Sequence, residues 1–100
     1  MSDEKQQGQV QIQIKLDDDV AQGVYANMAM VNHTDAEFIL DFIWVQPQAP
    51  QASVRSRVIT SPRHMKRLVA AMQENLAKYE AQHGQVDMGV APPPVGGFKH

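Results

Sequence analysis

Hydrophobic and polar residues alternate along four segments in the first 60 positions of the chain. In residues 9–16, aliphatic side chains at even positions alternate with glutamine and lysine at odd positions. A period of two is typical of a strand with one buried face. Three further segments, separated by turn-forming Asp, Gly, Asn and Pro residues, are predicted to be strands over 24–31, 38–45 and 52–60.

The apolar period then changes from two to three or four residues, which is typical of an amphipathic helix. Ser61 followed by Pro62 is a typical helix start, and Gly84 is a typical C-terminal cap. The residues of one apolar stripe are Met65, Leu68, Val69, Met72, Leu76 and Tyr79. The pattern therefore predicts a helix over 62–83. The predicted fold is α+β, a four-stranded antiparallel meander followed by one long C-terminal helix packed on one face.

The length of 100 residues allows one domain. We expect a disordered N-terminal tail over 1–8, a single α+β domain over 9–84 and a flexible Pro/Gly-rich tail over 85–100. A domain of this size has a small core, and oligomerisation often stabilises such domains.

Short loops favour antiparallel pairing of consecutive strands, and the loop centres suggest a register. In that register Asn27, Asp41 and Arg57 lie side by side across three strands, on the face that the helix does not cover. An apolar face with a polar trio at its centre predicts a subunit interface. Its predicted residues are Tyr25, Asn27, Val31, Ile39, Asp41, Ile43, Val45, Arg57 and Ile59. The alternative is a solvated face with a few exposed aliphatic side chains.

Charge is distributed unevenly along the chain. Residues 1–42 hold eight acidic and two basic residues, net −6, whereas residues 43–67 hold five basic residues and no acidic one, net +5. An anion or nucleic-acid site is therefore a candidate around the start of the predicted helix, where free amides attract anions. Its residues are Arg55, Arg63, His64, Lys66 and Arg67. The alternative is solvated charge, and the overall charge of −2 argues against nucleic acid.

The sequence carries no catalytic or cofactor signature. It has no cysteine, and its four histidines lack the spacing of a metal site. We expect no enzymatic activity, cofactor or metal. No apolar run approaches the length of a membrane span, and the polar N-terminus lacks a signal-peptide core. We therefore expect a cytoplasmic protein that does not bind membranes.

Several stretches together resemble a family of unknown function, domain-of-unknown-function family 3467. They are Gly23–Asn27, Glu37–Phe42, Ser56–Ile59, Ser61–Leu68 and Asn75–Glu80, with His33 between the first two. The resemblance covers most of residues 20–84 and implies a small cytosolic bacterial protein with no known activity.

These observations favour a non-catalytic module that forms a homodimer or higher homo-oligomer, or that contacts an unidentified protein partner. One alternative is anion or nucleic-acid binding through the basic segment. Another is a polypeptide-binding chaperone similar to SecB, which rests only on the shared order of strands followed by a long helix.

Overall fold

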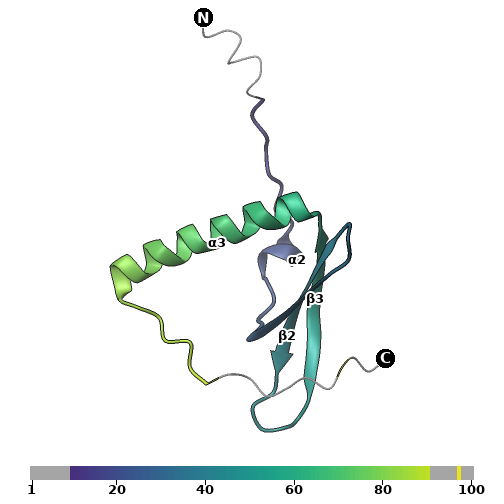
Figure 1. Cartoon of the computed structure of the whole chain (residues 1–100), viewed down its shortest axis with the longest axis vertical. Helices are drawn as coiled ribbons and strands as arrows, with labels where there is room; N and C mark the ends of the chain where they lie inside the picture. The colour runs from purple at the N-terminus through teal and green to yellow at the C-terminus, as the bar shows by residue number, and fades with distance from the viewer. Residues whose placement is uncertain (1–9, 91–96, 98–100) are drawn as a thin grey trace, which may run out of the picture.

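The computed structural model describes residues 10–90 and residue 97. Its elements, in chain order, are α2 (Asp18–Ala21), β1 (Met28–His33), β2 (Phe38–Val45), β3 (Ala52–Thr60) and α3 (Pro62–His83) (Figure 1). The predicted tail over 1–8, and most of the predicted tail over 85–100, lie outside the described residues.

The sheet is an antiparallel meander in the order β1-β2-β3. This confirms the α+β class and the antiparallel sheet followed by a helix, but the predicted number of strands is wrong. Residues 10–16 have the alternating pattern of a strand yet pair with none of the described strands. A strand exists only through a ladder with a neighbour, so the pattern alone does not make one.

The central strand β2 contains the buried residues of the described chain. Leu40, Asp41 and Ile43 are 4%, 0% and 3% exposed. They lie on β2 because it alone in this sheet has a strand on each side. The isolated chain therefore has a very small core.

The turn between β1 and β2 sets their register. The backbone N–H of Thr34 donates to the carbonyl of Glu37 (2.9 Å). The Thr34 hydroxyl oxygen accepts from the N–H groups of Ala36 (3.2 Å) and Glu37 (3.1 Å). This tight turn places Met30 opposite Asp41, where the predicted register had Asn27. The predicted register of this hairpin is wrong because the turn is centred later in the chain than expected.

The register between β2 and β3 agrees with the prediction at its centre, where Asp41 lies opposite Arg57. An irregularity follows between Phe42 and Ile43, and Ile43 then lies opposite Val54. Arg55 is the additional residue of this bulge. A one-residue shift moves side chains to the opposite face, so Val54 joins the face that carries Ile43.

The helix α3 begins and ends where the sequence predicts. Ser61 caps it, with its hydroxyl oxygen accepting from the N–H of His64 (3.2 Å). At the C-terminal end Gly84 has a φ of 94°, and its N–H donates to the carbonyl of Glu80 (2.9 Å). The left-handed region favours glycine at this position.

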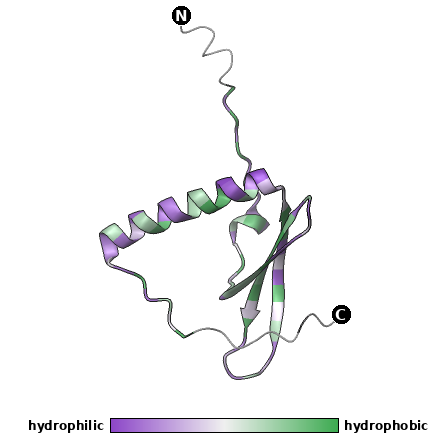
Figure 2. Ribbon diagram, viewed as in Figure 1, coloured by the Kyte–Doolittle hydropathy of each residue, from purple (hydrophilic) through white to green (hydrophobic). Residues whose placement is uncertain are grey.

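The predicted packing of the helix on the sheet is wrong. No residue of α3 is buried, and Figure 1 shows the helix running away from the sheet. Only Ser61 separates β3 from α3, so the chain has little length with which to turn the helix back over the strands. Figure 2 shows apolar residues at intervals along this uncovered helix. Within the described residues its apolar stripe is half-buried at Met65 and Leu68 and exposed from Val69 onward.

A short helix, α2, lies where we predicted only a turn. Asp17 caps this helix, and its backbone carbonyl accepts hydrogen bonds from the N–H groups of Val20 (3.1 Å) and Ala21 (2.8 Å). The helix ends before Gly23, which has a φ of 72°. These residues separate segment 10–16 from β1.

The Thr34 hydroxyl should contribute to stability because it satisfies two backbone donors of the turn. We expect Thr34→Ala to lower the free energy of unfolding by about 1–2 kcal/mol. Thr34→Ser keeps the hydroxyl and should lose less. Urea denaturation of the three proteins measures the difference, and equal losses in both variants would contradict this account of the turn.

Candidate protein interface

An ion pair between β2 and β3 lies at the centre of one sheet face. The guanidinium of Arg57 donates from Nε to Oδ1 of Asp41 (2.7 Å) and from Nη2 to Oδ2 (3.0 Å). The Asp41 side chain is fully buried, whereas that of Arg57 is 49% exposed. Two parallel hydrogen bonds of this kind are the strongest arrangement for an arginine and a carboxylate.

These hydrogen bonds change the acidity of both groups. They hold the pKa of Asp41 below its ordinary value, assisted by the positive charge of Arg57 and opposed by burial. The same hydrogen bonds raise the pKa of Arg57 above its ordinary value. Asp41 is therefore an ionised carboxylate at neutral pH, paired with Arg57.

The surroundings of this ion pair are mostly apolar. We call this surface the Asp41 face. By strand register it comprises Met28, Met30, Asn32, Ile39, Asp41, Ile43, Val45, Ala52, Val54, Arg57 and Ile59. Its margin on β3 is open, since Val54 and Ile59 are 45% and 55% exposed. An apolar surface with a fixed polar pair at its centre suits contact with another protein surface.

The Asp41 face overlaps in part with the interface predicted from the sequence. It includes Ile39, Asp41, Ile43, Val45, Arg57 and Ile59 of the predicted set. Val31 lies opposite Leu40 and so belongs to the other face. Tyr25 precedes β1 and is 72% exposed. Met28, Met30 and Val54 were missed, and only the turn and the bulge assign them to this face.

Asn27 has a different role from the one predicted. Its side-chain oxygen accepts from the N–H of Val45 (2.8 Å), and its Nδ2 donates to the Val45 carbonyl (3.0 Å). Its backbone N–H donates to the carbonyl of Ile43 (3.0 Å). The side chain thus continues the β1–β2 ladder by one step and does not join the polar pair of Asp41 and Arg57.

The basic residues do not gather into a formed anion site. Arg55 lies in the bulge of β3, while Arg63, His64, Lys66 and Arg67 lie in the first turns of α3; all five are exposed. Pro62 has no N–H, and the N–H of His64 is taken by Ser61. The N–H of Met65 donates to the Ser61 carbonyl (2.8 Å). Anion binding at the start of α3 stays a prediction, because few backbone N–H groups there are left to bind an anion.

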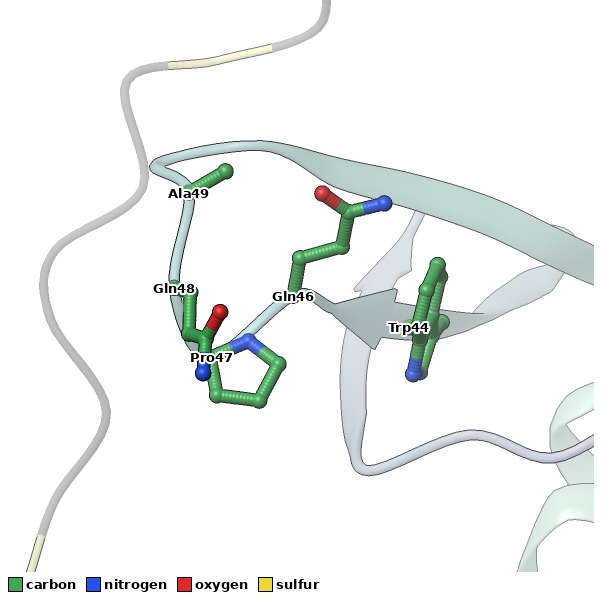
Figure 3. A pocket seen from close by; sticks show the side chains of 5 residues that line it. All are labelled: Trp44, Gln46, Pro47, Gln48 and Ala49. Carbon is green, nitrogen blue, oxygen red and sulfur yellow. The ribbon is translucent and has the colours of Figure 1, made fainter.

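A shallow hollow of about 440 Å³ lies beside the loop between β2 and β3 (Figure 3). Its lining residues are Trp44, Gln46, Pro47, Gln48 and Ala49. None of these side chains is an acid or a base. Among residues 10–90 and 97, no three His, Cys, Asp or Glu side chains cluster to hold a metal. Nor is any helix in the described residues long and apolar enough to cross a bilayer.

The fold and this face define a small α+β protein with a three-stranded antiparallel sheet and a protruding helix. The chain belongs to the family described as protein of unknown function (DUF3467), whose model matches residues 1–88. The match extends to the N-terminal side of the stretches that indicated the family, and so it includes segment 10–16. No curated protein and no solved structure matches the chain.

The lowered pKa of Asp41 predicts a specific dependence of stability on pH. The ionised carboxylate contributes its full stabilisation above pH about 3.9, the pKa of an aspartate in the unfolded chain. This stabilisation is lost as the pH falls through the lower pKa that Asp41 has in the folded protein. Wild type should therefore exceed Asp41→Asn in urea midpoint at pH 5, and this gap should narrow toward pH 2.

A matched control for this pH series is Asp35→Asn, which removes an exposed carboxylate in the turn. Its urea midpoint should stay close to that of wild type at pH 5. A gap between wild type and Asp41→Asn that stays constant from pH 5 to pH 2 would contradict the role assigned to the ionised carboxylate.

Proposed function

We propose that this protein is a non-catalytic module that assembles with further copies of itself. The observation that carries the proposal is the amphipathic helix α3, most of whose apolar stripe stays exposed within the described residues. Val69, Met72, Leu76 and Tyr79 are 37%, 51%, 51% and 52% exposed. Helices in proteins gain most of their stability from packing such a stripe, so a second surface is expected to cover it.

Exposed apolar side chains on the sheet support this proposal. On the Asp41 face, Val54 and Ile59 are 45% and 55% exposed. Together with the helix stripe, they give the described part of the chain a second apolar surface that another copy could cover.

The charge distribution favours copies of this chain over an unrelated partner. Residues 1–42 are net −6, and residues 43–67 are net +5. The basic residues include Arg63 and Lys66 at the N-terminus of α3, which is an unfavourable place for positive charge on a helix. The acidic half of a second copy would compensate this charge, so the sequence is electrostatically complementary to itself.

The alternatives from the sequence stay open as predictions. A site for anions or nucleic acid would use the exposed basic residues listed above, and its affinity would fall steeply with added salt. A chaperone similar to SecB would use the open strand edges to hold extended polypeptide. Neither has a further observation in its favour.

The assembly can be tested through the helix stripe. We expect light scattering at micromolar concentration to give wild type the mass of a dimer or larger species. Leu76→Glu places a charge in the stripe and should weaken the association about tenfold or more. Ala77→Glu adds the same charge at the next residue, off the stripe, and should assemble like wild type.

Both substituted positions are exposed in the isolated chain, so a protein that works as a monomer would tolerate the two changes equally. A monomeric wild type, or equal masses for the two variants, would overturn the proposed assembly. Circular dichroism of both variants shows whether α3 is still formed.

A further inference from the structure

Segment 10–16 has the sequence of a strand but pairs with none of the strands that the structure describes. Val10, Ile12, Ile14 and Leu16 are 78%, 83%, 89% and 65% exposed. Four aliphatic side chains on one face of an extended segment are expected to be buried in the working protein. The family model also spans this segment, so it is part of the family's domain.

The segment leads away from its own sheet. Figure 1 shows it extending from α2 to the far side of the helix α3, beyond the strands. Residues 17–27, which include α2 and the left-handed Gly23, connect it to β1. Pairing with β1 of the same chain would require this connection to be rebuilt, whereas pairing with another copy would leave it as it is.

The two edges of the sheet differ in how they are protected. The edge strand β3 carries a bulge and two arginines, Arg55 and Arg57, features that discourage pairing with a further strand. The other edge strand, β1, has the sequence Met-Ala-Met-Val-Asn-His, with no Lys, Arg, Asp, Glu or Pro and no bulge. The edge of β1 is therefore the one open to a fourth strand.

We propose that residues 10–16 of one chain pair with the edge of β1 in a second copy, so that each sheet gains its fourth strand from its partner. This inference rests on the proposed self-assembly and specifies the contact that makes it. Seven residues of the segment match the six residues of β1, each spanning about 20 Å. Main-chain hydrogen bonds provide the affinity, and the aliphatic side chains extend one apolar face of the partner's sheet.

The connection supports a second copy of this chain as the occupant. Residues 17–27 leave the segment beyond the strands of its own chain (Figure 1), whereas every copy carries the same open edge on β1.

Two adjacent substitutions test the side-chain alternation of the paired segment. Ile12→Lys places a charge on the apolar face and should weaken assembly about tenfold or more. Gln13→Lys places the same charge on the opposite face and should assemble like wild type. Sedimentation velocity over a concentration series measures both, and equal effects of the two changes would overturn strand pairing by this segment.

Disulfide trapping tests the identity of the partner, since the natural chain has no cysteine. Chains carrying Gln13→Cys and one affinity tag are mixed with chains of a second tag carrying Ala29→Cys, Met30→Cys or Val31→Cys. We expect disulfide-linked pairs that contain both tags after refolding of the mixture. The three β1 positions allow for different registers of the paired strands.

The outcomes separate this inference from the proposed function. An assembled wild type that yields no mixed-tag disulfide at any of the three positions overturns the strand exchange and leaves self-assembly standing. In a chain that carries both cysteines, a disulfide formed only within that chain would mean that the segment pairs with its own β1. A monomeric wild type would overturn both proposals.

Discussion

The two hydrogen bonds between Asp41 and Arg57 define the arrangement on which the sheet depends. A carboxylate can be removed from water only when a counter-charge and hydrogen bonds replace its hydration. Asp41 is fully buried, so β3 must present Arg57 directly opposite it. That requirement holds β2 and β3 in one register, because sliding by a single residue would leave a buried charge without its partner.

Further polar and backbone features lie on either side of this ion pair in the sheet. The bulge of β3 follows within two residues of the pair and changes the face on which Val54 lies. On the other side of β2, the hydrogen bonds between Asn27 and Val45 extend the β1–β2 ladder. The central strand is thus held by polar contacts on both sides. The apolar side chains around Asp41 complete a surface that a monomer only partly buries.

Much of the fold could be predicted from local patterns. The bounds of β2, β3 and α3 follow from apolar periodicity together with Ser61, Pro62 and Gly84, and the structure confirms them. The register of β1 could not be predicted reliably, since it depends on hydrogen bonds of one threonine in the turn. The sheet face on which Val54 lies depends on the bulge in β3, which the apolar periodicity of the sequence does not indicate. The opposition of Asp41 and Arg57 was predictable because the loop between their strands is centred where its two prolines indicate.

An amphipathic pattern predicts that a surface will be buried, but it does not identify the surface that will cover it. The helix stripe was expected on the sheet of the same chain, yet the single-residue connection at Ser61 carries α3 away from it. Segment 10–16 was expected beside the next strand, yet residues 17–27 intervene. In both cases the pattern is intact and the partner within the chain is absent from the described residues.

These two unpartnered patterns bear on how the protein becomes stable. Within the described residues the isolated chain buries Leu40, Asp41 and Ile43 alone. That is little apolar burial with which to offset the conformational entropy lost by a chain of this length. Under the proposed assembly, the strand segment and the helix stripe contribute their burial only when chains associate. Folding and association then become one equilibrium, and the stability of the protein depends on its concentration.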